Sequence, residues 1–448
     1  DLSVLERQNP GPLFDIIEEG LSRILEVRSR AEVNGALGIC RAEFDLDRLY
    51  KEAFDALMEE LRQGRDVQNG VTAIFIFRYL ERIGDSLLNI GEALIFAILG
   101  ERIKIEQFEA LQQTLTKTGY AGGLTSVDFK AIWGTRSGCR IGKVDSRREG
   151  QAAKPGVDPL GSIYKEGALR KILDEKAGLE LWAATYPGLV ADVYGFHEDG
   201  DKGSLLVEFL PGCNLDEVLL TAGEDVLQNA LFILTQTVQD IWETTRRQEP
   251  VPAGFMAQLS ARLPEVLQIH PGFSWPEREI CGRIAPGTPE LLAACAEVEA
   301  GLPAPFSVLI HGDFNVNNMV YNHQSQRLHY LDVHRSRQQD YVQDVSVFLV
   351  SNYRMPVFET QLRQRINWMM AEFLSFARAF AHEARDETFE ARMALALARS
   401  LFTSTRFELN PAFSRGMCQR AHYLMERVAE HRGRPWQAFR LPEQVLFN

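Results

Sequence analysis

Residues 311–344, HGDFNVNNMVYNHQSQRLHYLDVHRSRQQDYVQD, are the most informative stretch of the sequence. It follows an apolar run, FSVLI, and places Asp313, Asn318 and Asp332 in an order that suits metal-assisted phosphoryl transfer. A carboxylate at Asp313 can orient a hydroxyl or accept its proton, while Asn318 and Asp332 offer the hard oxygen ligands that Mg²⁺ prefers. The residues between Asn318 and Asp332 predict a short hairpin, so this loop should lie beside a pair of strands.

An ordinary polar turn between two buried strands is the alternative interpretation, because Asp and Asn are common turn residues. A lone His-Gly-Asp would favour that alternative. Asn318, Asp332 and Asp344 all follow at the spacing that a catalytic loop needs. Because several matching residues are better evidence than a single short motif, the catalytic loop is favoured.

These residues resemble the catalytic loop of the aminoglycoside phosphotransferase and choline kinase families, which reads His-Gly-Asp, four residues, Asn, and later Ile/Leu-Asp at the end of a strand. The resemblance implies a two-lobed, protein-kinase-like fold that uses ATP and Mg²⁺. It also implies that Asp313 is the catalytic base, that His311 supports the loop, and that Asn318 and Asp332 bind the metal.

The residues after Asp332 both follow and depart from the family pattern. Asp340 and Asp344 resemble the segment that holds the catalytic loop from behind. His334, Arg335 and Arg337 stand where this family often has an aromatic or acidic residue. These basic side chains could contact a phosphate or an acidic substrate.

The same resemblance implies a nucleotide site in the preceding hundred residues. In SIYKEG, Lys165 resembles the lysine that contacts the α- and β-phosphates, and Glu175 is preferred to Glu180 as its ion-pair partner. Lys143 is the competing lysine. Because Lys and Glu usually lie on solvated surfaces, the residue types alone leave this choice open.

Two backbone segments complete the expected nucleotide site. Gly134 and Gly138 flank a tight turn between two predicted strands, SVDFKAIWG and CRIGKV, and could cover the phosphates, although glycines also serve any hairpin. Glu208 to Leu210 resemble the hinge whose backbone groups meet the adenine.

Composition sets limits on the class of protein. The 448 residues are 45% hydrophobic and 24% charged, which is typical of globular proteins and long enough for about three domains. The net charge of −13 argues against general nucleic-acid binding. No apolar run reaches the roughly 20 residues of a membrane helix, and six scattered cysteines are most simply free thiols, so we expect a cytoplasmic protein without membrane insertion.

Residues 12–117 have a helical pattern and predict three long antiparallel helices, with breaks around Arg41 and Gly64. The third helix contains RYLERIGDSLLNIGEAL, which resembles the PhoU family of phosphate-uptake regulators. That resemblance implies a metal-binding pair at Glu81 and Asp85, whereas charged residues at helical spacing usually form solvated ion pairs. The bundle could also supply a homodimer face or bind a protein partner.

The sequence therefore predicts an α+β chain with a PhoU-like helical bundle at residues 1–118, a kinase-like N-lobe at 119–212 and a helical C-lobe with the catalytic loop at 213–448. We expect transfer of the γ-phosphate of ATP to a hydroxyl of a small molecule. The alternative is a nucleotide-binding regulatory pseudokinase that acts through protein partners and responds to phosphate status. A protein kinase ranks last, because no His-Arg-Asp, Asp-Phe-Gly and Ala-Pro-Glu set is present.

Overall fold

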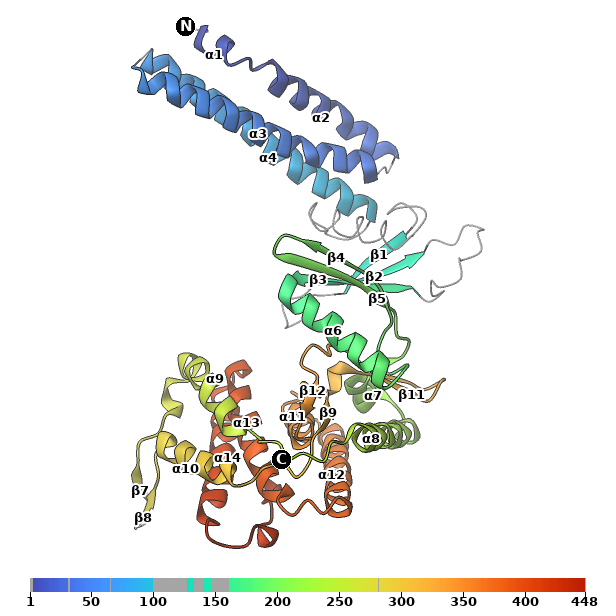
Figure 1. The fold of residues 1–448 in the computed structure, drawn as a ribbon. Helices are drawn as coiled ribbons and strands as arrows, with labels where there is room; N and C mark the ends of the chain where they lie inside the picture. The colour runs from blue at the N-terminus through green and yellow to red at the C-terminus, as the bar shows by residue number, and fades with distance from the viewer. Residues whose placement is uncertain are drawn as a thin grey trace. The chain divides into compact units, whose positions relative to one another are not determined.

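The computed structural model describes residues 3–30, 33–64, 66–99, 127–132, 140–146, 161–280 and 282–447. The chain divides into two compact units (Figure 1). The N-terminal unit contains Asp1–Leu173 and Val193–Phe209, and the C-terminal unit contains Asp174–Asp192 and Leu210–Asn448. None of the helices in the described ranges combines the length and the hydrophobicity that a membrane-spanning helix requires.

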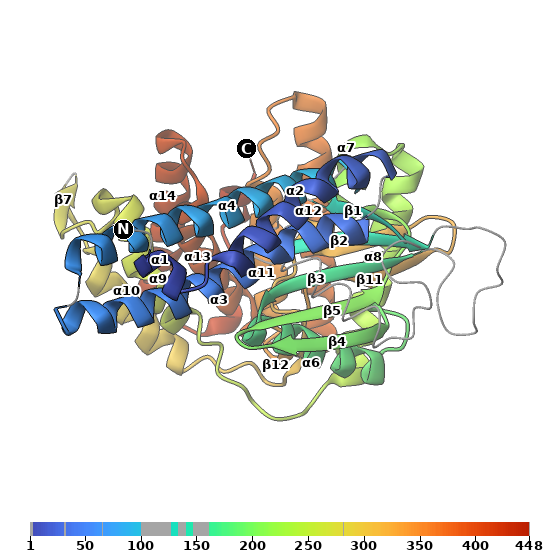
Figure 2. The ribbon, with the colours of Figure 1, turned by 90° about the horizontal axis from the view of Figure 1, so that it is seen from above.

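Three long helices form the predicted bundle at the start of the chain. After the short α1 (Ser3–Arg7), α2 (Gly11–Arg30), α3 (Val33–Arg62) and α4 (Val67–Leu99) run side by side (Figure 2). Their apolar faces bury side chains such as Leu57 and Phe77, both fully inaccessible to solvent. Burial of such a stripe is what stabilises helices in proteins, since isolated helices are marginal in water.

The predicted helix break around Arg41 is wrong. Helix α3 is continuous from Val33 to Arg62, because Ala36 and Cys40 are buried at helical spacing against α4. A Cβ added at Gly91 of α4 would lie 3.0 Å from the Ala36 carbonyl oxygen and would collide with the Cys40 sulfur. The segment around Arg41 therefore stays helical, because it packs closely against α4 in the middle of α3.

An antiparallel five-stranded sheet follows the bundle in sequence. Its order is β1-β2-β3-β5-β4, formed by β1 (Val127–Ile132), β2 (Arg140–Ser146), β3 (Ser162–Ala168), β5 (Lys202–Glu208) and β4 (Val193–Asp199). Helix α6 (Leu169–Thr185) directly follows β3. A Cβ at Gly203 of β5 would lie 3.1 Å from Ile172, so a glycine allows the start of α6 to pack closely on the strand.

The C-terminal unit is mainly helical. Its helices are α7 (Leu215–Thr221), α8 (Glu224–Thr245), α9 (Phe255–Ile269), α10 (Thr288–Ala300), α11 (Val342–Tyr353), α12 (Thr360–Glu383), α13 (Phe389–Ser404) and α14 (Pro411–Glu430). Helix α13 is the centre of this unit: it contacts α9, α11 and α14, and nearly all of its residues are buried.

Short strands in the C-terminal unit hold the loop that carries the motif. The predicted hairpin is present as β10 (Met319–Asn322) and β11 (Arg327–Tyr330), and β6 (Cys213–Asn214) extends it. The buried β9 (Val308–Ile310) pairs with β12 (Arg337–Gln339). A separate hairpin joins β7 (Arg278–Ile280) and β8 (Arg283–Ala285).

Candidate active site

The start of the motif loop is anchored by one buried carboxylate. The loop leaves β9, and the backbone N–H groups of His311 and Gly312 donate to the two oxygens of Asp344, at 2.7 and 2.9 Å. Asp344 lies in the first turn of α11. Burial raises the pKa of Asp344 to about 7, although the two N–H donors favour the charged form.

His311 ties the loop to the strand end that carries Asp332. Its Nε2 lies 2.8 Å from the Leu331 carbonyl oxygen, and its Nδ1 accepts a hydrogen bond from the Asp313 N–H at 3.2 Å. These two contacts require the neutral tautomer with the proton on Nε2. Burial lowers the pKa of His311, which keeps the ring neutral near pH 7.

Asp313 projects from this anchored loop and is partly exposed. Its Oδ2 lies 3.1 Å from a guanidinium nitrogen of Arg335, and the Asn315 amide lies 3.3 Å from Oδ1. The Asn318 amide donates to the Asp313 backbone carbonyl at 2.9 Å. Since the Asn318 –NH₂ group is engaged there, its carboxamide oxygen is the group available to a cation.

A backbone hydrogen bond ties together the chain segments of the two predicted metal ligands, because Asn318 directly precedes β10 and Asp332 follows the end of β11. The Leu331 N–H donates to the Asn318 carbonyl at 2.8 Å, one residue before Asp332. Asp332 has a φ of +53°, in the left-handed region that Asp tolerates better than most residues and that is often found at functional sites. Asn318 and Asp332 thus fit Mg²⁺, which takes few protein ligands and completes its shell with phosphate and water oxygens.

The region behind the loop contains a buried charge network. Arg392 of α13 pairs with Asp340 and Asp386, and the Tyr341 hydroxyl donates to Asp386 at 2.7 Å. All four side chains are buried. Asp344 therefore contacts the loop directly, whereas Asp340 joins the start of α11 to α13.

Part of α6 packs on the segment that follows Asp332. The His334 N–H donates to Glu175 at 3.1 Å, and the Trp182 indole donates to the Ser336 hydroxyl at 2.7 Å. Gly178 faces the Val333 carbonyl so closely that no Cβ would fit. Glu175 is thus a structural partner of the backbone beyond Asp332.

The other predicted nucleotide residues lie in several parts of the chain. Lys165 lies on β3 in the N-terminal unit with only 9% of its surface exposed, and Glu208 ends β5 in the same unit. Leu210 begins the second segment of the C-terminal unit. Gly134 and Gly138 lie outside the described residues.

Several residues that support the loop had no signal in the sequence. The Ser336 hydroxyl donates to the His311 carbonyl at 3.3 Å, and the Gln343 amide donates to the Gly312 carbonyl at 3.4 Å. Arg399 of α13 donates to the Ser346 hydroxyl at 3.2 Å. These side chains come from different elements, and single Ser, Gln and Arg residues are too common to suggest a role by themselves.

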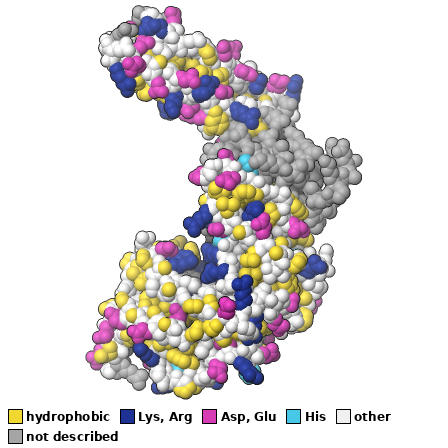
Figure 3. Space-filling view, in the orientation of Figure 1, with side chains coloured by type: hydrophobic (Ala, Val, Ile, Leu, Met, Phe, Trp, Pro, Cys, Tyr) yellow, Lys and Arg dark blue, Asp and Glu magenta, His cyan; other side chains and the backbone are white. Residues whose placement is uncertain are grey.

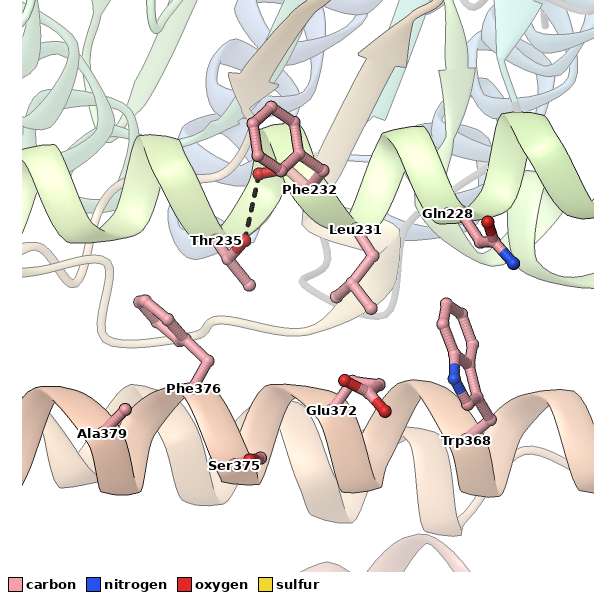
Figure 4. A pocket seen from close by; sticks show the side chains of 9 residues that line it. All are labelled: Gln228, Leu231, Phe232, Thr235, Trp368, Glu372, Ser375, Phe376 and Ala379. Carbon is pink, nitrogen blue, oxygen red and sulfur yellow. Dashed lines mark hydrogen bonds between the residues drawn. The ribbon is translucent and has the colours of Figure 1, made fainter.

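A groove of about 380 Å³ lies elsewhere in the C-terminal unit, between α8 and α12 (Figure 4). Leu231 and Phe232 line one side, and Trp368 and Phe376 line the other. None of the motif residues lines it, so this groove is separate from the candidate active site.

The bundle contains a smaller group of carboxylates. Burial raises the pKa of Glu43, and the nearby charges of Asp47, Asp85 and Glu81 act in the same direction. Glu81 also pairs with Arg78 at 2.5 Å. Among the residues described, no group of three or more acidic, His or Cys side chains is arranged to hold a metal ion, so metal binding by Glu81 and Asp85 stays an untested prediction.

The antiparallel sheet and the helical unit that carries the anchored loop are the parts of an α+β kinase-like fold, and a helical bundle precedes them in the chain. Residues 12–94 match the PhoU domain family, and residues 253–379 match the ecdysteroid kinase-like family. The chain thus carries a PhoU domain at its N-terminus and a kinase-like domain after it.

Individual relatives fall in the same two groups. A PhoU homolog of the phosphate-specific transport system from Clostridium acetobutylicum is 30% identical over 82 residues, which are 18% of this chain and 37% of that protein. The PhoU protein of Edwardsiella tarda is 30% identical over 97 residues, or 21% of this chain and 40% of its own length. The chain therefore spans well under half of these relatives.

Solved structures similar to this chain include two small-molecule kinases. An aminoglycoside-3'-phosphotransferase of type VIII is 16% identical with a TM-score of 0.40, covering 64% of this chain and 96% of that one. An ethanolamine kinase of Plasmodium vivax is 10% identical with a TM-score of 0.35, covering 68% of this chain and 82% of that one.

Proposed function

We propose that this chain is an ATP- and Mg²⁺-dependent phosphotransferase that transfers the γ-phosphate to a hydroxyl of a small molecule. The observation that carries the proposal is the anchored loop: Asp344 and His311 hold it, and it presents Asp313 beside Asn318 and Asp332. Positioning and charge neutralisation supply most of the catalysis of phosphoryl transfer, so a rigid loop of this kind is what the reaction needs.

Each residue then has a defined part in the reaction. Asp313 orients the acceptor hydroxyl and accepts its proton as the bond to the γ-phosphorus forms and the bond to the leaving ADP oxygen breaks. Asn318 and Asp332 would hold the Mg²⁺, which neutralises the phosphate charge when bound. His311 contributes by positioning the loop, because its ring nitrogens are already engaged with Leu331 and Asp313.

The nucleotide would bind the residues that the sequence analysis predicts for the nucleotide site. Lys165 would contact the α- and β-phosphates, and Glu208 to Leu210 would meet the adenine. Glu175 would support the site through the His334 backbone, as well as through the predicted ion pair with Lys165. We retain the predicted division into a bundle at 1–118, an N-lobe at 119–212 and a C-lobe at 213–448.

Substitution of Asp313 tests this proposal. We expect Asp313→Ala to lower kcat for acceptor-dependent ADP release by at least about 10²-fold, a typical loss for removal of a general base. Nucleotide affinity should change little, because Asp313 faces the acceptor. Glu430→Gln, which breaks an exposed ion pair with Arg427, is the control and should turn over normally. Undiminished turnover in Asp313→Ala would contradict the proposal.

The second candidate is a nucleotide-binding regulator that acts through protein contacts. Two observations favour it. One is the match to a PhoU domain, and the other is the ion pair between Arg335 and Asp313, which engages the carboxylate that the reaction would need. A regulator would bind ATP and Mg²⁺ but release almost no ADP with any acceptor. The same ADP-release assay, run beside nucleotide-binding calorimetry, separates the two candidates.

A further inference from the structure

Five arginines of the C-terminal unit lie within reach of one another's charges, and one of them, Arg335, contacts Asp313. This arginine cluster brings together residues from α9, the segment after Asp332, β12, α13 and the short helix η4 (Thr405–Phe407): Arg262, Arg335, Arg337, Arg399 and Arg406. The charges of Arg262 and Arg337 act on Arg399, and those of Arg262 and Arg335 act on Arg406. Figure 3 shows Lys and Arg side chains gathered closely on the visible face of the C-terminal unit.

The cluster is connected to the candidate active site by direct contacts. Arg335 lies 3.1 Å from Asp313. Arg337 donates to the Gln343 side chain at 3.2 Å, and the Gln343 amide in turn donates to the Gly312 carbonyl. Arg337 is therefore one side chain away from the catalytic loop.

The described residues neutralise this charge only in part. Arg335 pairs with Asp313, and Arg406 pairs with Glu265 at 3.0 Å. Among the described parts of the chain, Arg262, Arg337 and Arg399 form no ion pair with a carboxylate. The charge of Asp344 acts on Arg337 and on Arg399, but its two oxygens already accept the N–H groups that anchor the loop.

Arg399 carries a buried charge that donates a hydrogen bond to the neutral hydroxyl of Ser346. Only 9% of its surface is exposed, and its buried Nε has no hydrogen-bond partner. Burial, together with the charges of Arg262 and Arg337, lowers the pKa of Arg399 to about 10, while Asp344 and Asp313 act in the opposite direction. Buried charges are normally paired, and a guanidinium left unpaired is strongly unfavourable.

We propose that the arginine cluster binds an anionic group, a phosphate or a carboxylate, on the acceptor molecule whose hydroxyl Asp313 orients. The identification of the bound molecule as the acceptor rests on the proposed function. The existence of an anion-binding site does not depend on it. Guanidinium groups bind the oxygens of either anion with paired hydrogen bonds, and an anion here would relieve the repulsion among the arginines. The acceptor class is therefore a hydroxylated acid or phosphate ester.

Binding to the intact protein tests the anion site independently of catalysis. Calorimetry would use inorganic phosphate, glycerol 3-phosphate, glycerate, glycerol and choline, each in the presence of Mg²⁺ and a non-hydrolysable ATP analogue. We expect the anionic compounds to bind and glycerol and choline not to bind. A preference for glycerol 3-phosphate over glycerate, or the reverse, identifies the anion as phosphate or carboxylate.

Arg262→Gln is the informative variant, because Arg262 makes no ion pair within the described residues and its loss leaves no buried carboxylate behind. We expect its Kd for the anionic compounds to rise roughly ten-fold or more, the value of one charge-assisted contact, with nucleotide affinity unchanged. Arg427→Gln, which alters an exposed pair with Glu430, should bind like the wild type.

The outcomes separate the two proposals. Absence of anion binding at millimolar concentration, an unchanged Kd in Arg262→Gln, or a loss of nucleotide affinity instead would overturn the acceptor site. Phosphoryl transfer to neutral or cationic alcohols alone would overturn the proposed anionic acceptor. The proposed phosphotransferase activity would still stand. Anion binding without ADP release from any acceptor would support the anion site and contradict the proposed function.

Discussion

At the scale of single residues, both the backbone conformation and the neighbouring atoms require a glycine at position 312. Its φ is +82°, and an added Cβ would lie 2.5 Å from the Arg335 carbonyl oxygen. An L-residue is strained in this conformation and would also push the segment after Asp332 away from the motif loop. The glycine of the motif thus permits contact between the two parts of the site.

We expect Gly312→Ala to destabilise the protein by about 1–3 kcal/mol and to lower kcat strongly, because backbone strain and a steric clash act together. Gly433 is the matched control: its φ is also +82°, but no atom lies within 4 Å of an added Cβ. Gly433→Ala should show only the backbone cost, roughly 1 kcal/mol, with normal turnover. Urea titration and ADP release measure both effects, and equal losses of turnover in the two variants would contradict this account.

Asp344 gives a prediction on pH. Burial raises its pKa to about 7 in the folded protein, from 3.8 for an unperturbed Asp. Between these values the folded state retains a proton that the unfolded state has lost, so this group's contribution to the free energy of unfolding falls as pH rises towards 7 and then levels off. Below the lower value both states are protonated and the contribution is constant.

Asp344→Asn cannot titrate, and we expect its free energy of unfolding to fall less than that of the wild type between pH 5 and pH 7, the window set by these pKa values. Urea titrations of both proteins at several pH values give the difference, which removes the effect of other titrating groups such as His311. Parallel curves for the two proteins would show that Asp344 keeps an ordinary pKa.

At the scale of elements, α11 and α13 are joined by the buried charge network. Arg392 has no exposed surface, and its partners Asp340 and Asp386 belong to the turns before α11 and α13. Two helices that hold the loop are thereby fixed to each other. Burial raises the pKa of Asp340, while the adjacent Arg392 acts in the opposite direction.

Removal of Arg392 should leave buried carboxylates without a counter-charge. We expect Arg392→Ala to lower the free energy of unfolding by about 3–5 kcal/mol, typical of breaking a buried ion pair. Arg427→Ala, which breaks an exposed pair on α14, should change it by no more than about 0.5 kcal/mol. Thermal melts of both variants decide the matter, and a small effect of Arg392→Ala would mean that the network contributes little.

At the scale of the whole molecule, the chain combines a helical bundle with a kinase-like domain, and the buried cluster of the bundle also includes Tyr164 and Leu206 of the sheet. The chain nevertheless divides into two compact units. We expect scanning calorimetry to resolve at least two transitions. ATP with Mg²⁺ should raise the Tm of one of them, because a ligand stabilises the part that binds it, and Asp332→Ala should abolish that rise.

The other transition should respond to the bundle alone. Gly91→Ala, which inserts a methyl group between α3 and α4, should lower its Tm and leave the nucleotide-dependent transition in place. A single transition that both changes shift together would show that the bundle and the kinase-like domain unfold as one.

Most helices and strands, and the motif at residues 311–332, could be predicted from the sequence alone. The spacing of Asp313, Asn318 and Asp332, the hairpin between them and the strand SIYKEG follow from local patterns, because turns, strand alternation and helix periodicity are set by neighbouring residues. The same rules misplaced the break at Arg41, where packing of α3 against Gly91 overrides a polar stretch.

The contacts between side chains far apart in the sequence become visible only in the folded chain. The arginine cluster joins residues between 262 and 406, and Arg392 finds Asp340 from 52 positions away. Glu175, which the sequence predicts as the partner of Lys165, accepts a hydrogen bond from the His334 backbone. No local pattern predicts such contacts, because the burial of α13 at the centre of the C-terminal unit brings these charges together and the low polarity there makes their pairing matter.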